Sequence, residues 1–181
     1  NVSNIVRHDK GRTFATLKRT IEEGLGYTFF AQVLSSETLV PQKRRRCFMV
    51  AFRGDLGIDD FEFPSLEGNP IPLKSALENE VDDAFTISDR RWEGHKRRTA
   101  NNLARGAGFT TFEADLDRPS NTLVARYYKD GKECLIPQAG KNPRMLTPRE
   151  CANLQGFPSS SKATKVEIAS LLLCFTPVLR F

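Results

Sequence analysis

Residues 42–46 place four cations in a row of five, Gln42-Lys43-Arg44-Arg45-Arg46, directly ahead of the apolar run Cys47–Phe52. The guanidinium group of arginine is always charged and presents a planar fork of donors, which matches the oxygens of a phosphate or a base. Such a cluster beside a buried strand predicts a binding site for an anionic partner. On these residues alone, a solvated cationic turn remains the alternative.

The distribution of charge over the chain also favours a polyanion. The net charge is +5 over 181 residues, but residues 55–89 hold ten of the 22 acidic residues and one of the 27 basic residues. The rest of the chain is therefore strongly basic, which is typical of a nucleic-acid-binding surface beside an acidic insert. Solubility alone would also account for a basic surface.

A helix and two strands are expected to position the cationic cluster. From Thr13 onward, apolar side chains recur at helical spacing until glycines offer a stop, at Phe14, Leu17, Ile21 and Leu25 and then Gly24 and Gly26. Thr28–Leu34 predicts a strand. Cys47–Phe52 predicts a second strand, apolar on both faces and so covered on both sides of a sheet. Two strands are marginal by themselves, so we expect the edge of a larger α/β sheet.

The middle of the chain changes character. Gly54–Asp89 is acidic and proline-containing and predicts a linker or insertion, with a short helix around Leu73–Val81. A second basic cluster, Arg90–Arg98, contains the only tryptophan, and a glycine-bearing loop at Leu103–Phe109 follows it.

The last third of the chain carries signals for a hairpin and two helices. Thr122–Tyr128 and Glu133–Pro137 flank an Asp-Gly pair, which predicts a β-hairpin with one of its two tyrosines in the core. Thr147-Pro148-Arg149-Glu150 has the pattern of a helix start with a capping box. Lys165–Phe175 predicts a final amphipathic helix.

Several classes of protein are excluded or disfavoured. The four cysteines share no CxxC spacing, so we expect buried or half-buried thiols and neither a zinc site nor a disulfide framework. No apolar run is long enough to cross a bilayer. The chain opens without a signal peptide, and the expected location is the cytoplasm, with no membrane partner.

Four separated segments resemble one family, the DNA cytosine-5 methyltransferases. Asn1-Val2 and its continuation to Phe14 look like the family's Glu-Asn-Val motif without its Glu. Gln42, Arg44 and Arg46 match the Gln-x-Arg-x-Arg motif. Thr122–Gly131 looks like the end of a target-recognition region in the Dcm-like branch. Residues 144–158 are similar to the family's ninth motif. The resemblance therefore covers residues 1–158, in family order.

Parts of the family pattern have no counterpart in this sequence. The amino-terminal half, with its S-adenosylmethionine loop and Pro-Cys-Gln nucleophile, is not matched, and the residues after Pro158 include no Gly-Asn motif. The resemblance thus implies a carboxy-terminal portion of such an enzyme. We expect this chain alone to bind no cofactor and to be inactive, while the complete enzyme would use S-adenosylmethionine.

The resemblance also implies roles for the cationic cluster. In the family, a thiolate attacks a cytosine that has been flipped out of duplex DNA, and an arginine holds the base oxygen as charge develops there. Arg44 and Arg46 are expected at the flipped base and its adjoining phosphate, in either order, with Gln42 bracing the loop. For Lys43 and Arg45 we favour a solvated turn.

Target recognition would fall to residues 90–143. Arg105, beside Gly106 and Gly108, could approach a guanine edge, although the glycines could equally make a simple turn. Five further cations are expected at DNA phosphates, with a solvated face as the alternative: Lys96, Arg97, Arg98, Arg126 and Lys129.

The expected fold is mixed α/β, the edge of a Rossmann-like methyltransferase sheet with a small, mostly β or irregular target-recognition domain. Its expected parts are residues 1–53 from the catalytic sheet, an acidic linker at 54–89, the recognition domain at 90–143 and a helical return segment with an atypical tail at 144–181.

Three functional hypotheses follow. The first is a carboxy-terminal fragment or subunit that binds duplex DNA and needs an amino-terminal methyltransferase half for catalysis. The second is a non-catalytic DNA-binding module or an inactive remnant. The third is a degraded product that forms a homodimer through its exposed sheet edge.

Overall fold

The computed structural model describes residues 1–106, 111 and 113–158. The chain divides into two compact units, and its path crosses between them within the cationic cluster. Unit 1 holds Asn1–Ser36 and Arg44–Gly68, and unit 2 holds Glu37–Lys43 and the chain from Asn69 onward. Each unit has its own packing.

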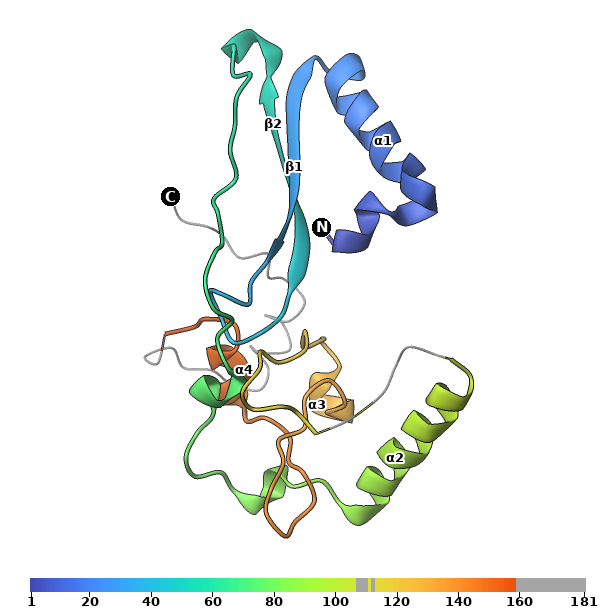
Figure 1. Cartoon of the computed structure of the whole chain (residues 1–181), viewed down its shortest axis with the longest axis vertical. Helices are drawn as coiled ribbons and strands as arrows, with labels where there is room; N and C mark the ends of the chain where they lie inside the picture. Colours follow the sequence, from blue (N-terminus) through green and yellow to red (C-terminus); the bar gives the residue numbers. More distant parts are fainter. Residues whose placement is uncertain (107–110, 112, 159–181) are drawn as a thin grey trace. The chain divides into compact units, whose positions relative to one another are not determined.

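Unit 1 is a helix on a two-stranded antiparallel sheet (Figure 1). Helix α1 spans Arg12–Arg19 and continues as a π turn at Thr20–Gly24. Strand β1 (Tyr27–Ser35) pairs with β2 (Arg45–Arg53). The helix and both strands expected from the sequence are thereby confirmed, and each strand extends one or two residues beyond the predicted range at either end.

Aromatic side chains cover both faces of this sheet. On one face, the rings of Phe14 and Phe29 lie 6.0 Å apart, which joins the helix to β1. On the other face, Phe61 lies 5.7 Å from Phe30 and 5.6 Å from Phe52. The segment after β2 therefore runs back along the sheet and packs on it, whereas the sequence predicted a linker or insertion there.

Unit 2 is held together by one apolar cluster and little regular structure. Its helices are α2 (Asp89–Ala104), α3 (Tyr127–Asp130) and α4 (Pro148–Asn153). The cluster consists of Leu73, Ala76, Leu123, Tyr127, Cys134, Ile136, Leu146, Cys151 and Leu154. In the part that the structure describes, strand pairing in unit 2 is limited to isolated bridges. Residues 90–143 were expected to be mostly β or irregular; their described part holds one long helix and irregular structure, so the mostly β expectation is wrong.

The predicted hairpin at Thr122–Pro137 is also wrong. Tyr127–Asp130 forms one helical turn, and Gly131, at φ +63°, ends it as a left-handed cap. Tyr127 is 2% exposed, and its hydroxyl donates to the Cys134 carbonyl at 2.6 Å. The expectation that one of the two tyrosines is in the core is confirmed, because Tyr127 belongs to the apolar cluster of unit 2 whereas Tyr128 is 61% exposed.

One predicted helix and one predicted loop differ in extent from the observed elements. The segment Leu73–Val81 forms only a single 3₁₀ turn at Leu73–Ala76. The predicted loop at Leu103–Phe109 begins later, because Leu103 and Ala104 are the last residues of α2. The expected final helix at Lys165–Phe175 lies outside the described residues.

The capping box of α4 is confirmed in full. The Thr147 hydroxyl accepts from the Glu150 amide at 3.1 Å, and the Glu150 carboxylate accepts from the Thr147 amide at 2.8 Å. Of the four cysteines, Cys47, Cys134 and Cys151 are free and buried as expected, and Cys174 lies outside the described residues. No helix in the described ranges has the length and apolar character needed to span a membrane.

Candidate nucleic-acid interface

The cationic cluster alternates between half-buried and exposed side chains. Arg44 and Arg46 are half-buried, whereas Lys43 and Arg45 are exposed. Within unit 1, the Arg44 amide donates to the Ser36 hydroxyl at 3.2 Å, and the Arg44 carbonyl accepts from the Ser36 amide at 3.1 Å. Arg44, just before β2, and Arg46, within it, are thus held partly out of water, while Lys43 and Arg45 are exposed to it.

The half-buried arginine pair is under electrostatic strain from burial and from its own like charges. Burial, and then the charge of Arg46, lowers the pKa of Arg44. Burial also lowers the pKa of Arg46. Guanidinium groups nevertheless stay charged in proteins, so two like charges are held close together with reduced hydration. An anionic group between them would offset both the repulsion between the two charges and the loss of their hydration.

The backbone of Asn1-Val2 lies beside this pair in unit 1. Val2 bridges Arg46 in antiparallel fashion, and the Cys47 amide donates to the Asn1 carbonyl at 2.9 Å. Two segments more than 40 residues apart, which sequence reasoning joined only by resemblance, therefore meet in space.

The first two residues of the cluster belong to unit 2 and are tied to residues 120–122. Gln42 is 2% exposed and bridges Ser120 in parallel fashion. The Lys43 amide donates to the Ser120 carbonyl at 2.8 Å, and the Thr122 hydroxyl donates to the Lys43 carbonyl at 2.8 Å. The sequence did not predict that Ser120 and Thr122 support this loop. The one signal nearby was the family-like run that begins at Thr122.

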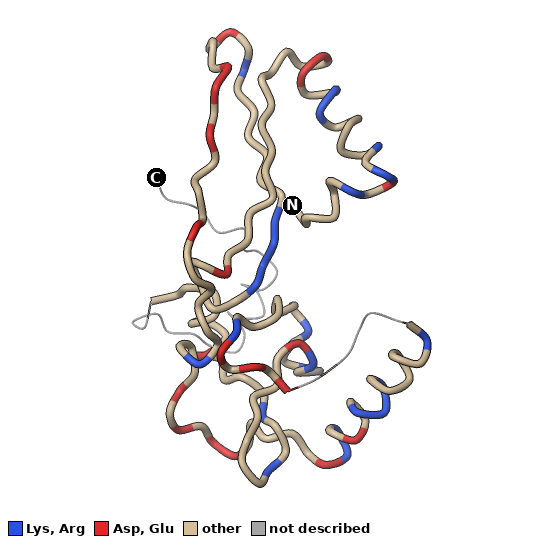
Figure 2. The backbone as a smooth tube through the Cα atoms, in the orientation of Figure 1, with Lys and Arg blue, Asp and Glu red and all other residues tan. Residues whose placement is uncertain are grey.

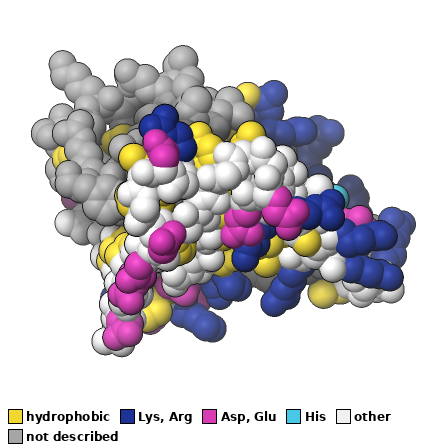
Figure 3. Space-filling model, turned by 90° about the horizontal axis from the view of Figure 1, so that it is seen from above, with side chains coloured by type: hydrophobic (Ala, Val, Ile, Leu, Met, Phe, Trp, Pro, Cys, Tyr) yellow, Lys and Arg dark blue, Asp and Glu magenta, His cyan; other side chains and the backbone are white. Residues whose placement is uncertain are grey.

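The predicted DNA contacts of unit 2 are exposed and lie mainly on α2. Figure 2 shows lysine and arginine repeated along this helix, and in the view of Figure 3 basic side chains gather in clusters. Gly106, at φ +66°, follows the helix, and Gly108 lies outside the described residues. The exposed cations are Lys96, Arg97, Arg98 and Arg105 on or just after α2, and Arg126 and Lys129 at α3.

A groove of about 320 Å³ lies between α2 and α3. It is lined by Ser88, Arg90, Arg91, Gly94, His95, Arg98 and Lys129, and we call it the Gly94 groove. Its walls are joined by Arg91, which donates from Nη2 to the Lys129 carbonyl and from Nη1 to the Met145 sulfur at 3.3 Å. Arg98 and Lys129 were predicted as phosphate contacts, and the structure brings them together there. Arg90 and Arg91 were missed, although both stand in the predicted basic cluster.

Lys96 differs from the other cations of α2. Its ammonium group forms an ion pair with Glu93 and lies 5.7 Å from the centre of the Trp92 ring. It does not line the Gly94 groove.

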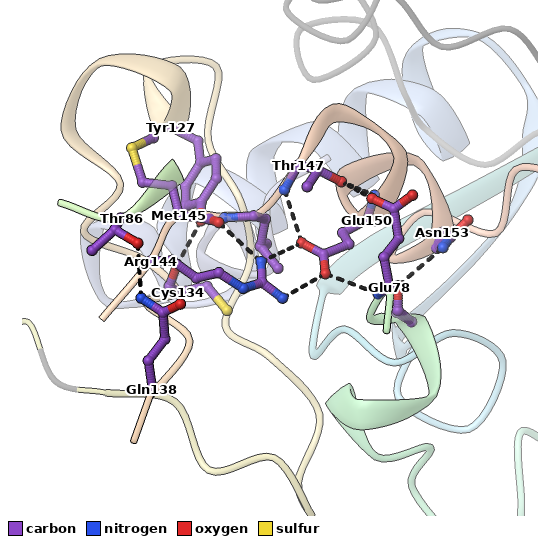
Figure 4. A network of polar contacts seen from close by, with 12 residues as sticks. Glu78, Thr86, Tyr127, Cys134, Gln138, Arg144, Met145, Thr147, Glu150 and Asn153 are labelled. Carbon is purple, nitrogen blue, oxygen red and sulfur yellow. Dashed lines mark hydrogen bonds and ion pairs between the residues drawn. The ribbon is translucent and has the colours of Figure 1, made fainter. Parts of the chain in front are cut away.

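A buried polar network organises the segment before and within α4 (Figure 4). Arg144 pairs with Glu150, which also accepts from the Glu78 amide at 3.0 Å. The Asn153 side chain donates to the Ala76 carbonyl at 3.0 Å. The contacts of this network are made within unit 2, where they hold the segment before and within α4 in place.

Comparison with known proteins establishes the class of the chain. The model of the C-5 cytosine-specific DNA methylase family matches residues 1–167. The chain belongs to that family, whose members are S-adenosylmethionine-dependent.

Several curated relatives are type II methyltransferases. M.SsoII of Shigella sonnei is 44% identical over 163 residues, which cover 88% of this chain and 43% of the relative. M1.ScrFI of Lactococcus lactis subsp. cremoris is 45% identical over 165 residues, covering 88% and 42%. The DNA-cytosine methyltransferase of Escherichia coli K12 is 30% identical, with 90% and 41% covered. The chain thus spans less than half the length of these relatives.

Solved structures share the mixed α/β fold. A Spodoptera frugiperda DNMT2 mutant matches with a TM-score of 0.64 at 17% identity, over 95% of this chain and 60% of that one. The S. pombe Dnmt2 methyltransferase matches with a TM-score of 0.61 at 17% identity, over 95% and 59%. At this identity, the likeness concerns the fold alone.

Proposed function

We propose that this chain supplies the DNA-recognising, carboxy-terminal portion of a cytosine-C5 DNA methyltransferase and is inactive without an amino-terminal half. The observation that carries the proposal is the half-buried pair Arg44 and Arg46 beside Asn1-Val2. A charged pair with reduced hydration is matched to a ligand that brings negative charge, such as a flipped cytosine and its phosphate.

In this proposal the arginines act on the flipped base. One guanidinium donates to the base oxygen O2 as negative charge develops there, and the other holds the adjoining phosphate. Gln42 braces the loop through its bridge to Ser120. The nucleophilic thiolate and the carboxylic acid would come from the amino-terminal half, because the three described cysteines are all buried.

The family's methyl donor does not fit the described part of this chain. A Rossmann-like site binds its cofactor where a strand turns through a glycine-rich loop into a helix. The only sheet in residues 1–106, 111 and 113–158 is an antiparallel pair, whose strands are joined by residues 36–44 without such a helix. We therefore assign S-adenosylmethionine binding to the complete enzyme.

DNA contacts in unit 2 would come from exposed cations. Arg105, next to Gly106, would approach a guanine edge, while Arg97, Arg98, Arg126 and Lys129 would neutralise phosphates. Lys96 is the weakest of these candidates, since Glu93 already balances its charge.

Complementation tests the proposal. The chain would be mixed with an amino-terminal methyltransferase portion that carries the Pro-Cys-Gln motif, and methyl transfer from labelled S-adenosylmethionine to duplex DNA would be measured. We expect transfer only with both parts present. Transfer by this chain alone, or none from a correctly assembled mixture, would contradict the proposal.

A second candidate function is a DNA-binding module without catalysis. It is favoured by the Gly94 groove, which unit 2 forms from its own residues. Salt-dependent binding to duplex DNA, with no methyl transfer in any mixture, would support this candidate.

A further inference from the structure

Gly94 is unexplained by packing within the protein. It lies in the interior of α2, where glycine is among the least favourable residues because it loses the most conformational freedom. A Cβ atom at this position would meet nothing within 4 Å, and the helical backbone there would accept alanine. By contrast, a Cβ at Gly131 would lie 2.8 Å from the Met145 side chain.

The open space above Gly94 is the Gly94 groove. Arg90, Gly94 and Arg98 follow one another at i, i+4 and i+8, so they share one side of the helix. Lys129 of α3 lines the groove from across. The glycine thus leaves the α2 backbone open between cations that project on either side of it.

The charged residues that line the groove are all basic. The seven described lining residues include four cations and no carboxylate. Of the cations, Arg91 is held in place by the Lys129 carbonyl and Met145, which fixes the distance between the two helices. Arg90, Arg98 and Lys129 are exposed. A ligand there must be anionic and slim enough to approach a helix backbone.

We propose that the Gly94 groove seats a backbone phosphate of duplex DNA, and that Gly94 is present so that the sugar-phosphate strand can approach α2 closely. This inference rests on the proposed function in DNA recognition and assigns α2 and α3 the task of fixing the register of the duplex. Glycine serves such close approaches elsewhere in proteins. Arg90, Arg98 and Lys129 supply the charge that neutralises the phosphate.

Gly94→Ala separates this role from a role in stability. If Gly94 serves DNA, the alanine should raise Tm by about 2–4 °C through its better helix propensity. The same variant should bind a duplex roughly tenfold more weakly at fixed salt, comparable to the loss of one charge-assisted hydrogen bond. Thermal unfolding followed by circular dichroism, and fluorescence anisotropy with a labelled duplex, measure the two effects on the full chain.

Ala100→Met is the matched control, because Ala100 is an exposed residue of α2 outside the groove lining. It adds bulk to the same helix and should leave DNA affinity unchanged. If Gly94→Ala binds DNA as tightly as the wild-type chain does, the groove assignment is wrong while the proposed function stands. If the wild-type chain itself fails to bind duplex DNA at low salt, both fall.

Salt dependence identifies the phosphate. Arg98→Ala should reduce the slope of log K against log salt by about 0.9, the value for one phosphate contact. Lys141→Ala is the charge-matched control, since Lys141 is exposed in unit 2 and pairs with Asp83 at 2.8 Å. An equal change of slope in both variants would mean that net charge, and not the groove, governs binding. Inorganic phosphate would be added as a competitor of the labelled duplex. If free phosphate at millimolar concentration displaces the duplex, the groove shows no preference for DNA, and the assignment to a DNA strand is overturned.

Discussion

Arg144 and Glu150 form a two-pronged ion pair inside unit 2. Both bonds, Nη1 to Oε2 and Nη2 to Oε1, measure 2.8 Å, and the two side chains are 8% and 0% exposed. The carboxylate also accepts from the backbone amides of Thr147 and Glu78. One acid therefore neutralises a buried cation, caps α4 and fixes the chain around residue 78.

Removing Arg144 without Glu150 should strongly destabilise the folded chain. Arg144→Met leaves the Glu150 carboxylate buried without its counter-charge, and we expect a loss of about 3–5 kcal/mol in the free energy of unfolding. The double variant Arg144→Met, Glu150→Gln buries no charge and should recover part of that loss. Urea unfolding measures both, with Lys141→Ala as the exposed ion-pair control, expected to change by less than about 1 kcal/mol. A loss in Arg144→Met no larger than in the control would show that the pair is not buried in solution.

Alkaline pH should destabilise unit 2. Burial, and then the Glu150 charge, raises the pKa of the Cys134 thiol from 9.0 to about 12. Burial also raises the pKa of Cys151 and of Tyr127. From about pH 9 upward, the unfolded chain releases protons that the folded chain retains, so stability is complete below this pH and falls as pH rises toward 12.

Urea midpoints at successive pH values under reducing conditions measure this dependence. Cys134→Ala should be less stable at neutral pH because it leaves a cavity, yet it should lose less than the wild-type chain between pH 9 and 11. A wild-type midpoint that stays constant over this range would contradict the expectation.

The cationic cluster should divide into two functional classes. In the complemented enzyme, Arg44→Ala and Arg46→Ala should each lower the rate of methyl transfer roughly 10²-fold or more, as removal of a transition-state donor does. Arg45→Ala should change the rate only a few-fold, because Arg45 is exposed. Equal effects in all three variants would mean that the cluster acts through its net charge.

Stability provides a second readout for the same pair without a partner chain. Because burial lowers the pKa of Arg44, the folded state disfavours its charge. Arg44→Met should therefore leave the fold as stable or more stable, whereas Arg45→Met should be neutral. Loss of function with retained stability is the behaviour of a binding residue. A destabilised Arg44→Met variant would instead indicate a structural arginine.

Local signals in the sequence were sufficient for much of the fold. The helix of unit 1, both strands and the capping box at Thr147 and Glu150 each depend on residues a few positions apart. The sequence singled out Arg44 and Arg46 from their neighbours only through the family-like motif, and their half-buried state is a finding of the structure.

Long-range relationships were beyond sequence reasoning. Nothing local connects Val2 with Arg46, or Gln42 with Ser120, and the groove beside Gly94 depends on α3 lying against α2. The Asp-Gly pair at Gly131 was misinterpreted because glycine at positive φ serves a hairpin turn and a helix end equally well. In the structure Gly131 follows the helical turn Tyr127–Asp130 as its left-handed cap.

Gly131→Ala tests that turn and the contact that supports it. Gly131 has φ +63°, and an added Cβ would lie 2.8 Å from Met145 Cγ. Gly140 is the matched control, since it has φ +69° but open space within 4 Å. Both alanine variants carry the cost of a left-handed residue, about 1–2 kcal/mol. Gly131→Ala should lose more in urea unfolding, because Met145 must also move.

The displacement of Met145 has a consequence for DNA binding. Its sulfur accepts from Arg91, which also binds the Lys129 carbonyl and so holds the two walls of the Gly94 groove together. Gly131→Ala should therefore weaken binding to duplex DNA at temperatures where the variant is still folded, whereas Gly140→Ala should not. If both variants bind DNA equally well, Met145 does not support the groove, and Arg91 must be held by the Lys129 carbonyl alone.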